Sequence, residues 1–140
     1  MTAPFFILFL TAFIIGVFVF IAILLTSKKK HALDKMEYQT DFLAIENDLD
    51  RNNKLSFNLC VVEADKLLDK ALRELNIPGN TMGERLKRLN RDRLPHLNDV
   101  WAAHKLRNQI AHEPRFSVEY NQARRALTVY RLALKDLGAI

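Results

Sequence analysis

One short segment combines an arginine, an asparagine and a histidine at a spacing that could serve phosphate chemistry. Residues 106–113 read Leu-Arg-Asn-Gln-Ile-Ala-His-Glu. A guanidinium binds phosphate oxygens through several N–H donors, and an imidazole takes up or releases a proton near neutral pH. One interpretation is therefore a phosphate-handling pair, in which Arg107 binds the anion and His112 moves a proton. The other is structural: an ion-paired arginine and a histidine that caps its helix.

The helix expected from about Leu97 to His112 places Arg107 on its apolar face. When successive residues are turned by about 100°, Arg107 and His104 fall among apolar side chains. An arginine there needs a carboxylate partner or a polar cleft. The preceding long helix offers Glu63 and Asp65, and Asp65 lies closer to the buried edge of that helix. We therefore favour Asp65 as the partner of Arg107.

Helical spacing of apolar residues runs through the rest of the chain and predicts an all-α fold. The expected architecture is a small bundle of four or five helices over residues 38–140, with two long helices, about 57–75 and 120–137, packed antiparallel. The motif Thr81-Met-Gly-Glu84 is typical of a capping box that starts a short helix. Ser117 is expected to cap the last helix.

The segment Leu106–Glu113 resembles the signature of HEPN domains, in which an arginine is followed by a polar residue such as Asn or His and then by a histidine four to six residues after the arginine. The upstream stretch Glu63–Asp69 is also similar to HEPN-like sequences, and the resemblance covers roughly residues 40–138 in helix order and length. It implies a helical bundle, often dimeric, in which the Arg and His of both chains face a shared cleft. Many such domains are metal-independent endoribonucleases.

Carried onto this chain, the resemblance implies a role for each residue of the segment. Arg107 would stabilise the transition-state phosphate, and His112 would act as acid or base on the ribose 2′-hydroxyl or the leaving oxygen. Asn108 would orient the phosphate or His112, and Asp65 or Glu63 would hold Arg107. The expected partners are RNA and a second copy of the chain. The family also has non-catalytic members, so the alternative is an interaction or dimerisation module that binds RNA or a protein.

A basic stretch after the capping box is a second candidate contact for RNA. Positive side chains at this density could follow an RNA backbone, although a solvated helix face is the alternative. The residues are Arg85, Lys87, Arg88, Arg91 and Arg93.

No metal or other cofactor is expected. His104 and His112 lie two helical turns apart, about 12 Å along the axis, which is too far to share one metal ion. The single cysteine, Cys60, lies within an apolar stripe and is interpreted as a small core residue.

The first 27 residues contain no Asp, Glu, Lys or Arg, although the whole chain carries a net charge of +5. The apolar run Phe5–Leu25 would extend about 31 Å as a helix, which predicts a transmembrane anchor over residues 1–27. A cleaved signal peptide is disfavoured because no positive n-region and no small-x-small cleavage site are present.

Three lysines follow the apolar run directly: Lys28, Lys29 and Lys30. Under the positive-inside rule they place the C-terminal side in the cytoplasm and the N-terminus outside. The expected organisation is a transmembrane anchor, a basic juxtamembrane linker over residues 28–37 and a HEPN-like domain over residues 38–140. The expected location is the cell membrane, as a single-pass protein in the lipid bilayer.

Overall fold

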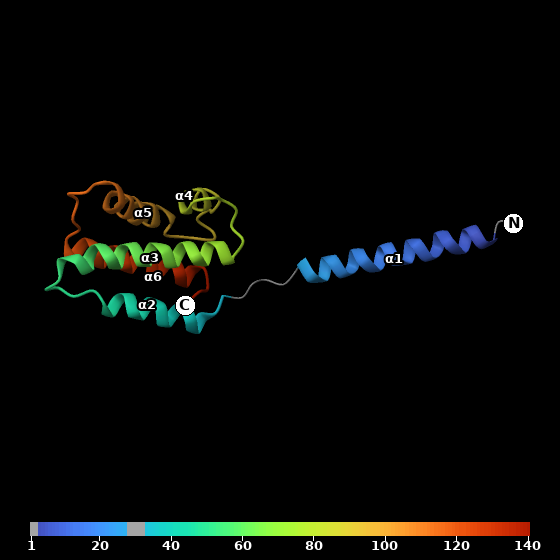
Figure 1. Ribbon diagram of the computed structural model, residues 1–140, viewed down its shortest axis with the longest axis horizontal. Helices are drawn as coiled ribbons and strands as arrows, with labels where there is room; N and C mark the ends of the chain where they lie inside the picture. Colours follow the sequence, from blue (N-terminus) through green and yellow to red (C-terminus); the bar gives the residue numbers. More distant parts are fainter. Residues whose placement is uncertain (1–2, 28–32) are drawn as a thin grey trace. The chain divides into compact units, whose positions relative to one another are not determined.

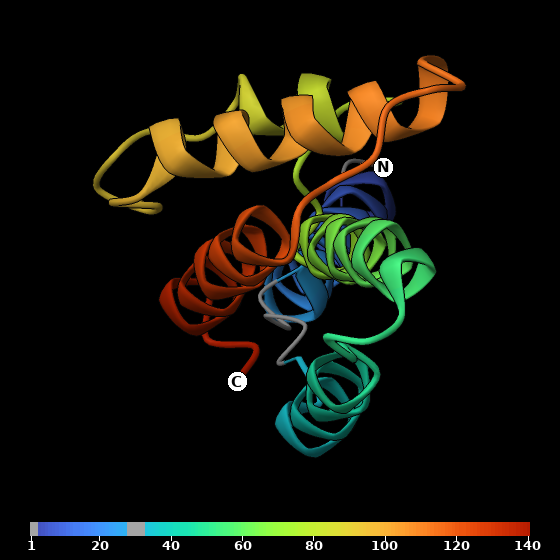
Figure 2. The ribbon, with the colours of Figure 1, turned by 90° about the vertical axis from the view of Figure 1, so that its left-hand side faces the viewer.

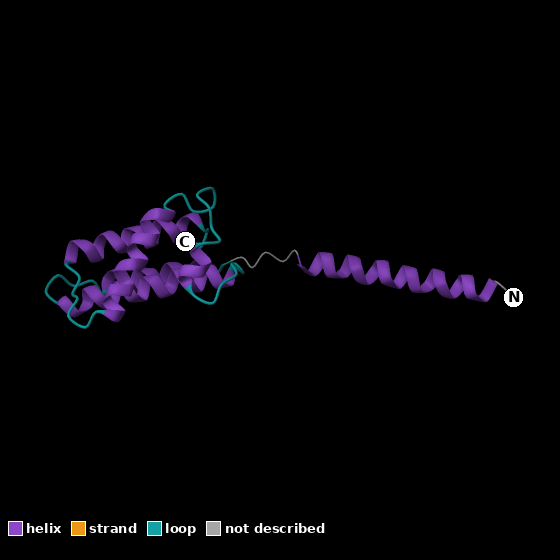
Figure 3. Ribbon diagram, turned by 90° about the horizontal axis from the view of Figure 1, so that it is seen from above, coloured by secondary structure: helices purple, strands orange, loops and turns teal. Residues whose placement is uncertain are grey.

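The computed structural model describes the backbone of residues 3–27 and 33–140, and every regular element in these ranges is an α-helix (Figures 1 and 3). The chain divides into two compact units, one formed by the first helix and the other by the remaining five. These elements agree with the predicted helical class. The helices are α1 (Ala3–Ser27), α2 (Lys35–Asn47), α3 (Lys54–Glu74), α4 (Met82–Leu86), α5 (Leu97–His112) and α6 (Tyr120–Asp136).

The predicted transmembrane anchor is not supported. Within residues 3–27 and 33–140, no helix has both the length and the apolar character needed to cross a bilayer. The anchor over residues 1–27 is therefore corrected. The cell-membrane location, the outside N-terminus and the lipid partner depended on that anchor and are withdrawn with it.

The predicted linker over residues 28–37 is described only in part. Lys28, Lys29 and Lys30 lie outside the described residues. Its C-terminal end is already structured, because Asp34 caps α2 by accepting hydrogen bonds from the backbone N–H groups of Met36 and Glu37. The bundle thus begins before residue 38.

The helix α3 forms the centre of the bundle. When the bundle is viewed along the axis of α3, α6 lies beside it (Figure 2). Helices α4 and α5 pack on one side of α3, and α2 packs on the other. Its apolar residues recur every three or four positions, so they share one wide face, and burying them against the other helices stabilises the domain. The most deeply buried are Val61, Ala64, Leu68, Ala71 and Leu72.

The two longest helices of the bundle, α3 and α6, run parallel, not antiparallel as predicted (Figure 1). Near their N-termini the rings of Phe57 and Tyr120 are 5.7 Å apart. Further along, the Tyr130 hydroxyl lies 2.9 Å from Asp65. The residue numbers therefore rise together along the contact. The physical reason is that α5, which crosses both helices steeply, and the loop after it bring the chain back to the end where α3 began (Figure 2). There the Val118 backbone N–H donates to Asn58 near the start of α3 at 3.0 Å.

The bounds of α5, Leu97–His112, agree with the prediction, whereas the start of α6 does not. Ser117 lies outside the helix, and Glu119 is the N-cap residue. The Glu119 backbone N–H donates to the Gln122 side chain at 2.9 Å. The Gln122 side chain thus accepts from a backbone N–H at the start of α6, which is the role that was predicted for the Ser117 hydroxyl.

Candidate functional site

A pocket of about 630 Å³ lies between α3, α4 and α5. Charged side chains from all three segments line it. The positive ones are Lys66, Lys87, Lys105 and Arg107, and the negative ones are Asp65, Asp69 and Glu84.

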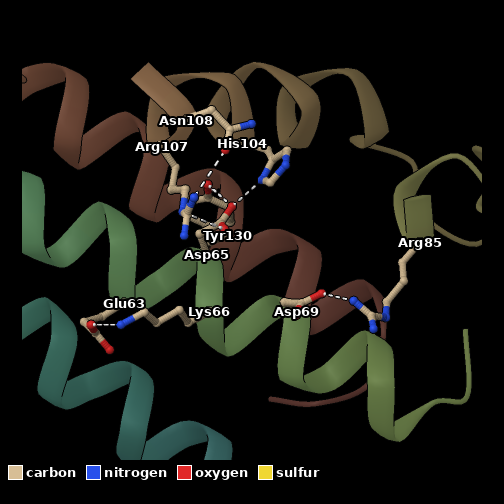
Figure 4. Close-up of polar contacts among 9 residues, drawn as sticks. All are labelled: Glu63, Asp65, Lys66, Asp69, Arg85, His104, Arg107, Asn108 and Tyr130. Carbon is tan, nitrogen blue, oxygen red and sulfur yellow. Dashed lines mark hydrogen bonds and ion pairs between the residues drawn. The ribbon is translucent and has the colours of Figure 1, made fainter. Parts of the chain in front are cut away.

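The carboxylate of Asp65 is the centre of a polar cluster at the inner wall of this pocket (Figure 4). Asp65 is only 4% exposed. Its Oδ1 accepts a hydrogen bond from the Tyr130 hydroxyl at 2.9 Å and lies 2.8 Å from Nδ1 of His104. Its Oδ2 is 3.5 Å from Nε of Arg107. One carboxylate thus connects α3 with α5 and α6.

Local helix geometry brings these groups together. Asp65 lies within the buried stripe of α3, and His104 and Arg107 are three residues apart on α5, so they project from adjacent turns of one face. The predicted pairing of Arg107 with Asp65 is present. Glu63, the other candidate, lies on a different face of α3 and pairs with Lys66 at 2.7 Å.

The protein partners of Arg107 fix the position of its guanidinium but do not accept hydrogen bonds from all of its N–H groups. Its Nη1 donates to Oδ1 of Asn108 at 3.3 Å. The separation of 3.5 Å between Nε and Asp65 suits an ion pair, but Nε makes no aligned hydrogen bond. A bidentate arginine–carboxylate pair would use two N–H groups at about 2.8 Å. The side chain is 28% exposed and lines the pocket, so N–H donors remain for an anion there.

His112 does not share this environment. It is the last residue of α5 and is exposed, and it is not among the residues that line the pocket. Five residues along a helix correspond to a rotation of about 140°, so Arg107 and His112 point in different directions from α5. Within one chain, therefore, the two residues of the predicted pair do not meet around one ligand.

The residue that sequence reasoning left without a role is His104. Its side chain is 12% exposed, lines the pocket and contacts Asp65. The available signal was its position in the apolar arc of α5 together with Arg107. Two polar residues on one apolar arc, His104 and Arg107, indicate a shared acidic partner, which is Asp65.

The five basic residues predicted as one RNA-contacting group have different surroundings. Arg85 is buried, and its Nη1 donates to Asp69 at 2.8 Å, so it ties α4 to α3. Lys87 is exposed and lines the pocket. The others are exposed and do not line it: Arg88, Arg91 and Arg93.

The start of α4 forms the opposite wall of the pocket. The Thr81 hydroxyl accepts a hydrogen bond from the Glu84 backbone N–H at 3.2 Å, as the capping motif predicts. The Glu84 carboxylate, however, accepts from the backbone N–H of Asn80 at 2.7 Å, one residue before the cap. This bond occupies the carboxylate and fixes the helix end that carries Gly83.

Within the described residues, no three His, Cys, Asp or Glu side chains are grouped so as to hold a metal ion. Cys60 lies in the core, and burial raises the pKa of its thiol. A thiolate is therefore disfavoured at this position.

Removing the hydroxyl of Tyr130 should weaken the domain measurably. Burial, and then the adjacent Asp65 carboxylate, raise the pKa of Tyr130, so the neutral hydroxyl is a stable donor to Asp65. We expect Tyr130→Phe to lower the free energy of unfolding by about 1.5–3 kcal/mol, the usual contribution of a hydrogen bond to a charged group. Urea titration followed by circular dichroism measures it. Tyr120→Phe is the control, and equal losses in both variants would contradict the assignment.

Comparisons of this chain with protein-family models, with curated proteins and with solved structures find no match. The HEPN resemblance therefore stays a prediction that depends on residues 106–113 and on the helix order. The chemistry of the pocket is argued from its own side chains.

Proposed function

We propose that the domain formed by α2–α6 binds RNA and holds a backbone phosphate in the pocket on Arg107. The observation that carries this proposal is the state of the guanidinium: Asp65 and Asn108 position it at the pocket wall, and part of it remains exposed. A side chain that is already ordered loses little conformational entropy on binding. A guanidinium also matches the geometry of phosphate oxygens.

The charges around Arg107 favour an anionic ligand. Three lysines share the pocket with it: Lys87, Lys105 and Lys66, of which Lys66 pairs with Glu63. The carboxylates of the same pocket already accept bonds from protein donors. Asp65 is hydrogen-bonded to Tyr130 and His104 and forms an ion pair with Arg107. Asp69 accepts from Arg85, and Glu84 accepts from a backbone N–H.

An extended polyanion fits this surface better than a small anion. Exposed arginines follow α4 directly in the chain, at positions 88, 91 and 93, so positive charge continues beyond the pocket. The HEPN resemblance favours RNA as that polyanion. An acidic protein segment is the competing occupant, and the experiment below distinguishes the two.

A catalytic form of the proposal is the metal-independent RNA cleavage that the resemblance implies. In that form Arg107 stabilises the charged phosphate, Asn108 helps to orient it and His112 transfers a proton. Because His112 points away from the pocket of its own chain, this form requires a homodimer in which a second copy supplies its histidine. Binding without cleavage is the alternative.

The test is the affinity of the full-length chain for a fluorescent single-stranded RNA, measured by anisotropy at low salt. We expect Arg107→Ala to weaken binding at least about tenfold, since a hydrogen bond to a charged group contributes about 1.5–3 kcal/mol. Arg107→Lys should recover only part of the loss because an ammonium lacks the planar fork. The matched control is Arg125→Ala, which removes an exposed arginine of α6 outside the pocket.

Two results would contradict the proposal. The first is a loss of affinity in Arg125→Ala as large as in Arg107→Ala, which would indicate general attraction between charges. The second is tighter binding of a poly-glutamate peptide than of RNA at the same salt concentration, which would indicate an acidic protein partner.

A further inference from the structure

We infer that His104, oriented by Asp65, is the proton-transfer group of this pocket and acts on the ribose 2′-hydroxyl next to the phosphate held by Arg107. The inference rests on the proposed RNA binding. It differs from the dimer scheme in that the guanidinium and the imidazole come from the same chain.

The contact with Asp65 decides which ring nitrogen of His104 is available. An ionised carboxylate only accepts hydrogen bonds, so Nδ1, at 2.8 Å from Oδ1, must carry the proton. The other nitrogen, Nε2, then holds the lone pair of the neutral ring. This arrangement presents a base at Nε2.

Nε2 lies on the α4 side of the pocket, and the His104 side chain is 12% exposed. His104 lines the pocket, and its ring is bonded to Asp65 on the side away from Nε2 (Figure 4). Gly83 of α4 stands nearby: a Cβ at that position would lie 3.8 Å from Nε2. Because this residue is a glycine, the α4 wall carries no side chain at that point beside Nε2. The Trp101 ring meets the imidazole edge-on, with 6.1 Å between ring centroids, and restricts its rotation.

The same carboxylate sets the imidazole and the guanidinium beside each other. His104 contacts Oδ1 of Asp65 and Arg107 contacts Oδ2. The two residues are three apart on α5, where Cβ atoms are about 5–6 Å from one another. For the proton transfer, the ribose of a phosphodiester on Arg107 must extend to Nε2, on the α4 side of the imidazole. His112, exposed at the end of α5, has no such relation to Arg107.

The reaction that this geometry supports is internal transesterification of RNA. Nε2 accepts the proton of the 2′-hydroxyl while O2′ forms a bond to phosphorus. The bond from phosphorus to O5′ breaks, and O5′ keeps the electron pair and takes a proton from a water molecule. The hydroxide that remains takes the proton from the imidazolium. The products are a 2′,3′-cyclic phosphate and a 5′-hydroxyl end, and no metal, oxidant or reductant takes part.

The experiment measures RNA binding and RNA cleavage on the same preparations of the full-length chain, with EDTA present. The key variant is His104→Asn, because its amide can still donate to Asp65 but has no nitrogen that takes up a proton. We expect its affinity for RNA to stay within about threefold of wild type, while its cleavage rate falls about 100-fold or more, as for loss of a general base. His96→Ala, an exposed histidine outside the pocket, is the control and should cleave normally.

A second variant separates a chemical role from a structural one. In His104→Ala, added imidazole should raise the cleavage rate several-fold, and circular dichroism should show a native helical signal. Loss of cleavage that imidazole does not relieve, or that follows an equal loss of affinity, would make His104 a structural residue and overturn the inference.

The remaining outcomes distinguish this inference from the proposed function. Wild-type protein that binds RNA but cuts none of a broad panel overturns the inference and leaves RNA binding intact. Full activity in His104→Asn together with none in His112→Ala also overturns it, in favour of the dimer scheme. Absence of RNA binding by the wild type overturns both.

Discussion

Replacing Asp65 by alanine is expected to lower the free energy of unfolding by about 3 kcal/mol, because loss of one partner of a buried ion pair costs about 3–5 kcal/mol. The variant leaves the Tyr130 hydroxyl and the His104 Nδ1–H without their acceptor, and it leaves the Arg107 guanidinium without its ion-pair partner. The value lies at the lower end because the Arg107 side chain is 28% exposed and water can reach part of it.

Urea denaturation of the full-length chain, followed by circular dichroism, measures this change. The matched control is Glu63→Ala on the same helix. The pair of Glu63 with Lys66 has side chains 42% and 59% exposed, and an exposed pair contributes about 0–1 kcal/mol. If the two variants lose similar stability, Asp65 does not organise the cluster as described.

The second large effect is expected from Leu68→Ala. Leu68 is 0% exposed and lies in the middle of α3, the helix against which α2, α4, α5 and α6 all pack. With helices on several sides the site has little room to collapse, so we expect a loss of about 2–5 kcal/mol. Domains unfold at a net cost of only about 5–15 kcal/mol, so a loss of this size is a substantial fraction of the total stability.

The change is measured as a shift of the urea midpoint with an unchanged slope. Leu59→Ala, which truncates a leucine of the same helix that is 55% exposed, is the control and should change the midpoint little. A small effect of Leu68→Ala, or a large one of Leu59→Ala, would mean that the buried face of α3 is assigned incorrectly. Loss of RNA binding in Leu68→Ala would follow from unfolding and carries no information on the pocket.

The sequence by itself determined those features that depend on local spacing and nearby capping groups. The all-helical class, the bounds of α5 and the Thr81 cap follow from the 3.6-residue period and from residues within one turn. The pairing of Arg107 with Asp65 was also accessible, because a charged residue on an apolar arc needs a partner on the facing stripe.

The tertiary structure decided everything that depends on how helices are placed against one another. The parallel course of α3 and α6 and the burial of Arg85 against Asp69 arise between segments that are distant in sequence. The contact of both His104 and Arg107 with the Asp65 carboxylate also depends on how α5 packs on α3, as does the position of His112 outside the pocket. The period of a helix states which side chains share a face, but only packing decides which other helix that face meets and which of its polar groups line an open pocket.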